Sequence, residues 1–294
     1  MTSLPATQQP SWASGMIAAL ALTLLAGCQS IPANTQGAIT PGAIGSEQIA
    51  NILASPDRST ADRTNDIRRK PAEMLAFIGI RPGMVAMDLS AGGGYTSELL
   101  ARAIGPGGRV YGQNPPRDAA APAPRPTVPE GGGPTRTMAI TSATITAATR
   151  QTLADRAKTP AIAPITVVTR KFDDPIPPEI APATLDLATL MFNYHDLGYL
   201  GADRAAMNRA VFAALKPGGI YVIADHSGRP GTGISESGTL HRIEEAFLRR
   251  EIEAAGFRQV ASGNFLRNPG DTRDKNVPVP AQPKDEFVLK FLKP

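Results

Sequence analysis

The sequence is poor in the residues from which disulfides and metal clusters are built. It has one cysteine, Cys28, in 294 residues, which excludes a disulfide within the chain and a cysteine-based zinc site. Its three histidines, His195, His226 and His241, leave little material for a metal cluster. We therefore expect no metal site.

Charge and aromatic residues are also limited. The net charge is +4 and no dense run of Lys or Arg occurs, so we expect no nucleic-acid partner. Aromatic residues make up 5%, while apolar residues make up 42%, which is enough for an ordinary buried core. Gly and Pro number 28 each, and this enrichment predicts long loops or unstructured segments beside the core.

Residues 1–28 contain no Asp, Glu, Lys or Arg. The apolar run Met16–Leu25 is too short to span a bilayer as a helix but suits a signal peptide. It leads into Leu25–Cys28, which resembles the lipobox of bacterial lipoproteins, although no basic residue precedes the run. We predict a lipid anchor at Cys28 and a place in the bacterial cell envelope, facing the periplasm. The alternative is a buried N-terminal helix with a stray cysteine.

The folded domain is expected over residues 46–294, after a polar linker at 29–45. A short apolar strand at Met84–Leu89 is followed by three glycines, a helix at Thr96–Ile104 and a strand at 109–112. This order predicts a parallel βαβ unit with a right-handed crossover.

The remaining pattern predicts a doubly wound, Rossmann-like α/β fold with a seven-stranded sheet, mostly parallel, and an antiparallel final strand. Residues 115–136 are rich in Pro, Ala and Gly and read as an insertion outside the core. Further strands are expected at Ile165–Val168, Leu185–Phe192, Ile220–Ala224, Gln259–Ser262 and Glu286–Phe291, and helices at Ser46–Leu53, Asp62–Ile78 (broken at Pro71), Thr141–Ala157, Arg204–Leu215 and Leu240–Ala255.

Polar residues gather where the predicted strands end. They are Asp88, Asn114, Asp173 with Asp174, Asn193–Asp196, and Asp225 with His226. In an open α/β sheet, ligands bind beyond the carboxyl ends of the strands, so these residues indicate one site. The alternative is that Asp and Asn are simply common in loops, which explains the two histidines poorly.

Two stretches carry a family resemblance. Val85–Gly94 with the helix after it resembles motif I of class I S-adenosylmethionine-dependent methyltransferases, and Leu215–Gly219 resembles the turn before their fifth strand. The resemblance covers roughly residues 66–294 apart from the insertion. Four shorter runs are similar to a bacterial group of predicted, often exported methyltransferases of unassigned substrate: Arg69–Glu73, Asn193–Asp196, Asp225–Ser227 and Phe265–Pro269.

The resemblance implies S-adenosylmethionine as cofactor. Gly92 and Gly94 would let the backbone approach it closely, and Asp88 would steady the loop near its amino group. The remaining cofactor contacts are expected from Ser90, Asn114, Asp173, Asp174 and Asn193. Ser90 and Asn114 depart from the family pattern, which usually has glycine and an acidic residue there, and both departures predict weak cofactor binding.

The acceptor side is expected at the ends of the fourth and fifth strands, with His195, Asp196 and His226 as catalytic residues. His195 could act as a general base, because an ordinary histidine pKa near 6.5 suits that role. Alternatively, His195 and His226 only bond to backbone groups at the strand ends. His241 is expected to be a surface or helix-capping residue.

Two functions remain open. The first is methyl transfer from S-adenosylmethionine to an unidentified small molecule. The second is an exported, non-catalytic binding protein that keeps the fold, which export favours because S-adenosylmethionine is made in the cytoplasm. A dinucleotide oxidoreductase fits less well, because the glycine loop lacks the Gly-x-Gly-x-x-Gly spacing.

Overall fold

The computed structural model describes residues 42–116, 151–159, 162, 164–278 and 280–294. These residues form a seven-stranded sheet in the order β3-β2-β1-β4-β5-β7-β6. All neighbouring pairs from β3 to β5 are parallel, and β7 is antiparallel to both β5 and β6. The predicted fold class is therefore confirmed. The strands are β1 Val85–Leu89, β2 Arg109–Asn114, β3 Ile165–Thr169, β4 Leu185–Met191, β5 Leu215–His226, β6 Arg258–Gly263 and β7 Glu286–Leu292.

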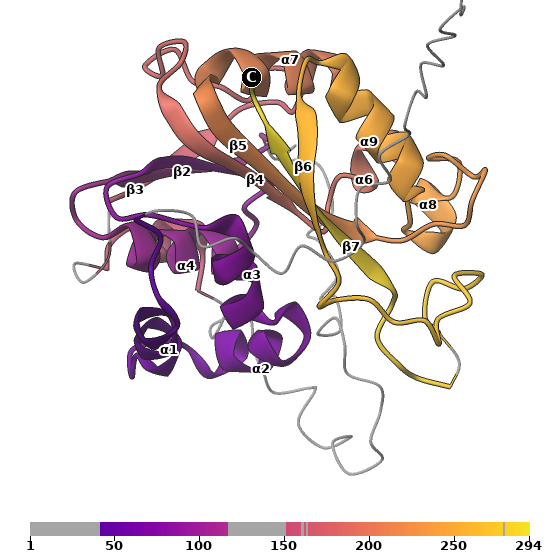
Figure 1. Cartoon of the computed structure of the whole chain (residues 1–294), viewed down its shortest axis with the longest axis horizontal. Helices are drawn as coiled ribbons and strands as arrows, with labels where there is room; N and C mark the ends of the chain where they lie inside the picture. Colours follow the sequence, from indigo (N-terminus) through magenta and orange to yellow (C-terminus); the bar gives the residue numbers. More distant parts are fainter. Residues whose placement is uncertain (1–41, 117–150, 160–161, 163, 279) are drawn as a thin grey trace, which may run out of the picture. The chain divides into compact units, whose positions relative to one another are not determined.

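Helices cover both faces of the sheet, as expected for a doubly wound fold (Figure 1). α1, α3, α4 and α5 contribute to one buried apolar cluster, while α7 and α9 contribute to the cluster on the other face. The helices of the described residues are α1 Ser46–Ala54, α2 Thr60–Arg69, α3 Pro71–Ile78, α4 Tyr95–Ile104, α5 Leu153–Arg156, α6 Asp196–Tyr199, α7 Arg204–Ala214, α8 Ser237–Leu240 and α9 Glu245–Ala254.

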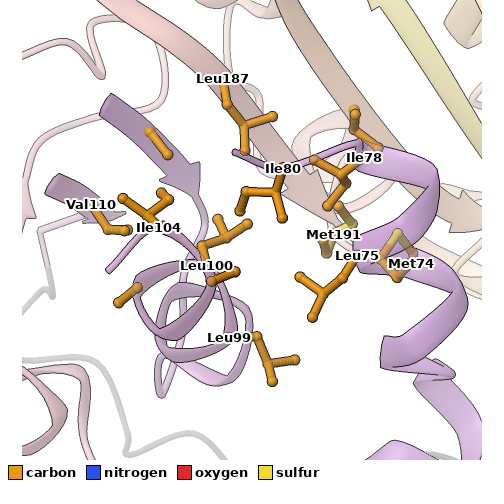
Figure 2. Packing of buried hydrophobic residues seen from close by; sticks show 14 of the residues in the cluster. Met74, Leu75, Ile78, Ile80, Leu99, Leu100, Ile104, Val110, Leu187 and Met191 are labelled. Carbon is orange, nitrogen blue, oxygen red and sulfur yellow. The ribbon is translucent and has the colours of Figure 1, made fainter. Parts of the chain in front are cut away.

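The core explains why β1 is apolar on both of its faces, apart from Asp88. Met87 and Leu89 are fully buried in one cluster and Ala86 in the other, so both faces of this strand are covered. In the cluster that contains Ala86, Leu100 of α4, Ile78 of α3 and Leu187 of β4 surround Ile80 (Figure 2). This packing fixes α3 and α4 on the same face of the sheet.

The break between α2 and α3 lies at the predicted place. Lys70 adopts a left-handed conformation with φ of 43°, and Pro71 starts the next helix. Proline has no amide hydrogen to donate and disfavours helical geometry in the residue before it, which accounts for the break. The folded part also begins slightly earlier than expected, because Ile44 is buried and its N–H donates to the Ile80 carbonyl at 3.0 Å.

Two predicted elements differ from the structure. The helix expected over Leu240–Ala255 starts only at Glu245, as α9, because His241 is left-handed and Ile243 forms a parallel bridge with Ser227. β5 starts at Leu215, before the predicted turn. Leu185 pairs with Leu215 and Leu187 with Ile220, so the turn residues between them form a bulge within the strand.

Several predictions concern residues outside those described. They are the signal peptide at 1–28, Cys28, the linker up to residue 41, most of the insertion at 115–136 and the helix expected over Thr141–Ala157 as far as residue 150. In the part of the chain that the structure describes, no helix is long and apolar enough to cross a membrane.

Candidate functional site

The candidate site lies at one edge of the sheet, where several strands end together. β1, β4 and β5 run parallel, with Leu89 opposite Leu190 and Met191 opposite Ala224. β7 runs the other way, so its first residue, Glu286, pairs with the last residue of β5, His226. The carboxyl ends of three strands and the start of a fourth therefore meet at this edge.

The loop after β1 uses the left-handed conformation three times. Ser90, Gly92 and Gly94 have φ of 53°, 56° and 86°. A side chain at Gly94 would collide with Leu153 and Arg156 of α5 at 2.9 Å, whereas a Cβ at Gly92 would meet nothing within 4 Å. Gly94 therefore allows close packing within the protein, while the space beside Gly92 is open to a ligand.

Asp88 lies beneath this loop and is bonded within the protein. Thr189 of β4 donates to one of its carboxylate oxygens and Ser97 of α4 to the other, each at 2.7 Å. Burial raises the pKa of Asp88 to about 6, against the opposing effect of these two hydrogen bonds. The side chain thus ties β1 to β4 and α4 under the loop.

Three residues predicted to bind the cofactor have other partners. Asn114 bonds to the backbone of Gly92 twice: its oxygen accepts from the N–H at 2.8 Å and its amide group donates to the carbonyl at 3.0 Å. Asp173 accepts from the N–H of Asp203 at 2.8 Å, and Asp174 forms an ion pair with Arg170. Asn114 thus braces the loop, and the two exposed aspartates take part in bonds around the end of β3.

A chain of hydrogen bonds joins the glycine loop to the end of β4. The Ser90 hydroxyl donates to the side-chain oxygen of Asn193, and the Asn193 amide group donates to Asp196. Asp196 in turn lies 2.9 Å from Nε2 of His195. The structure therefore brings together Ser90, Asn193, Asp196 and His195, as the sequence predicts.

Both ring nitrogens of His195 face carboxylates. Nδ1 lies 2.6 Å from Asp225, opposite the contact of Nε2 with Asp196, and the His195 backbone N–H also donates to Asp225 at 2.7 Å. Burial alone would lower the pKa of His195, but the charges of Asp225 and Asp196 and their hydrogen bonds outweigh it and raise the pKa to about 10. With its pKa raised in this way, His195 keeps its proton at neutral pH, which does not suit the general-base role expected for it.

The second predicted histidine lies beside a different carboxylate. Nδ1 of His226 is 3.0 Å from Glu286, and its ring centroid is 5.2 Å from that of His195. Glu286 also forms an ion pair with Arg68 of α2. Burial raises the pKa of Glu286 to about 7, although Arg68 and Arg69 oppose the shift. This carboxyl can therefore exchange a proton near neutral pH.

Sequence reasoning missed two members of this cluster, Glu286 and His241, and placed Asp225 at the site without a role. Asp225 was recognised only as a polar strand end, and Glu286 only as the start of a strand. His241 was expected to lie at the start of a long helix, but it is the C-cap residue of α8, and its Nδ1 lies 3.2 Å from Asp196. The sequence holds no signal for these pairings, because each joins residues 30 or more positions apart.

Comparisons with known proteins concern the fold. No family model matches the sequence, and no curated protein matches it. Among solved structures, the chain is similar to a SAM dependent methyltransferase from Aquifex aeolicus, with 14% identity, a TM-score of 0.47, and 85% of this chain and 100% of that chain covered. It is also similar to an arsenic (III) S-adenosylmethionine methyltransferase from Chlamydomonas reinhardtii, with 15% identity, a TM-score of 0.49, and 84% and 73% covered.

The order and direction of the strands define the fold. A Rossmann-like sheet ordered β3-β2-β1-β4-β5-β7-β6, with β7 antiparallel, is the arrangement of class I methyltransferases. The chain has this fold, and its glycine loop occupies the position after the first strand.

Proposed function

We propose that this chain is an S-adenosylmethionine-dependent methyltransferase that acts on a small-molecule acceptor. The observation that carries the proposal is the hydrogen-bonded chain from Ser90 of the glycine loop through Asn193 to Asp196. A cofactor cradled by the loop and an acceptor held at the polar cluster would lie next to each other. Methyl transfer requires that proximity.

The residues at the loop suit the methionine end of the cofactor. The open space beside Gly92, the Ser90 hydroxyl and the Asn193 side chain would hold it. The fit is poorer where the ribose and adenine would lie, because Asn114 is bonded to Gly92 and Asp174 to Arg170. We therefore expect weak binding.

When bound, S-adenosylmethionine supplies an electrophilic methyl group, and a hydroxyl or ammonium acceptor that takes it loses one proton. We assign that proton to the pair formed by His226 and Glu286. Their 3.0 Å separation and the Glu286 pKa of about 7 allow the pair to take up a proton at neutral pH. His195, which is already protonated, would instead hold Asp196 and Asp225 in place.

The second candidate is a non-catalytic binding protein that keeps the fold. Asn114 and Asp173 favour it. Both side chains were expected to reach the ribose and adenine of the cofactor, but both are hydrogen-bonded within the protein instead. Such a protein would use the open space beside Gly92 for a different ligand.

Calorimetric titration of S-adenosylmethionine into the full chain distinguishes the two candidates. The wild type should release heat, and Gly92→Val should not, because a branched side chain fills the open space beside the loop. Gly83→Val is the matched control: Gly83 also has a positive φ and open surroundings, but it lies before β1, at the opposite end of the strand. A folded wild-type protein that binds no cofactor defeats the enzyme proposal and favours the binding protein.

We also propose that the chain belongs to an exported group of such proteins and is anchored in the bacterial envelope through Cys28. Support comes from the apolar run and the lipobox-like sequence at Leu25–Cys28. Metabolic labelling with a fatty acid should mark the wild type but not Cys28→Ala. Equal labelling of both proteins, or an unlabelled wild type, refutes the anchor.

A further inference from the structure

Three potential metal ligands converge at the end of β4. His195 Nε2 lies 2.9 Å from Asp196 Oδ1, and His241 Nδ1 lies 3.2 Å from the same oxygen. One ligand atom from each residue lies within 4.8 Å of the other two. Atoms bound to one metal ion at about 2.0–2.2 Å lie roughly 3 Å apart, so the spacing already suits coordination.

We propose that His195, Asp196 and His241 form a binding site for one divalent transition-metal ion of the Zn²⁺ or Fe²⁺ type. Two imidazoles and one carboxylate are a donor set that such ions prefer, and three protein ligands leave coordination positions for water or a substrate. Mg²⁺ and Ca²⁺ are poor occupants, because they favour oxygen ligands. The site goes beyond methyl transfer and would exist in either candidate function.

Asp225 and Asn193 hold two of the proposed ligands in place. Asp225 is fully buried and lies 2.6 Å from Nδ1 of His195, so Nδ1 keeps its proton, while the ion takes the place of the proton on Nε2, which is released to solvent. Asn193 donates to the other oxygen of Asp196, which leaves Oδ1 for the ion. Metal-binding histidines usually have a carboxylate or carbonyl partner on the second nitrogen, as His195 does.

The proposed site is buried on the side of His195 and exposed on the side of His241. The His195 side chain is 3% exposed, whereas that of His241 is 38% exposed. An ion can therefore enter past His241 without unfolding the strand ends. The expectation of no metal site rested on the small number of histidines, but the fold gathers all three, with ring centroids of His226 and His241 at 5.2 and 5.7 Å from that of His195.

The test uses the full, untagged chain, freed of metal with a chelator. Co²⁺ is titrated while visible absorption is recorded, and Zn²⁺ and Mg²⁺ are titrated by calorimetry. We expect one Co²⁺ or Zn²⁺ per chain and a much weaker response to Mg²⁺. His241→Ala should lower the affinity for Zn²⁺ by at least about 10–100-fold, because even an outer-shell partner of a metal ligand is commonly worth that much.

His226→Gln is the matched control, because it removes a neighbouring histidine that is not in the proposed ligand set. It should bind Zn²⁺ within a few-fold of the wild type, and thermal melting without metal checks that each variant is folded. The proposal fails if folded wild type binds neither ion or if His241→Ala binds as tightly as the wild type. It also fails if His226→Gln loses as much affinity as His241→Ala. Asp196→Asn provides a second ligand variant if His241→Ala does not fold.

Discussion

Replacing Asp88 with asparagine should change how stability depends on pH. The Asp88 side chain is 1% exposed, and its pKa rises from 3.8 to about 6 because burial disfavours the charged form. A carboxyl whose pKa is raised in the folded state stabilises that state at low pH. The contribution is complete below about pH 3.8 and is lost as pH rises through about 6.

The expected size of this loss follows from the two pKa values. A tenfold change in proton affinity is worth about 1.4 kcal/mol, so the difference between 3.8 and about 6 corresponds to about 3 kcal/mol. Asp88→Asn lacks this titration. Its amide oxygen can still accept from Thr189, and its amide nitrogen can donate to the Ser97 hydroxyl.

Urea unfolding of both proteins between pH 4 and pH 8 measures the effect. The free energy of unfolding of Asp88→Asn minus that of the wild type should rise by up to about 3 kcal/mol across this range. Taking the difference between the two proteins cancels the free-energy contributions of all groups that titrate alike in both. A difference that stays constant with pH shows that Asp88 titrates in the folded protein as it does in the unfolded chain, and refutes the reasoning.

Three further predictions test the core and the site. Leu100→Ala should lower the free energy of unfolding by about 2–5 kcal/mol, because the side chain is fully buried; a loss below about 1 kcal/mol would contradict its place in the core. Arg156→Met should cost about 3–5 kcal/mol, because it takes an ion-pair partner away from buried Asp62 and from buried Glu98, of which Glu98 keeps Arg102, whereas Lys158→Met at the surface should change stability by less than about 0.5 kcal/mol. In metal-free protein, NMR should show the His195 ring protonated until about pH 10 and titrating at lower pH in Asp225→Asn; a wild-type titration near 6.5 would disprove the double carboxylate contact.

The sequence alone determined the strands, most of the helices and the edge of the sheet that carries the site. The run Val85–Leu89, the glycines after it and the helix at Tyr95–Ile104 are local patterns, and they predicted the βαβ unit correctly. The pattern also predicts that the polar residues after these strands lie near one another, because the carboxyl ends of parallel strands meet at one edge of the sheet. Asn193, Asp196 and His195 were therefore expected together, and they are together.

Only the tertiary structure decided which atoms face each other. Asn114 turns onto Gly92, and Glu286 reaches His226 because β7 runs antiparallel to β5. His241 lies beside Asp196 because it ends α8, which packs against α6, in a left-handed conformation instead of continuing a helix into α9. The same non-local contacts set the pKa of His195, since a histidine takes its proton affinity from the carboxylates that packing brings to its ring. Local sequence does not encode such pairings, because they depend on the register and packing of strands and helices far apart in the chain.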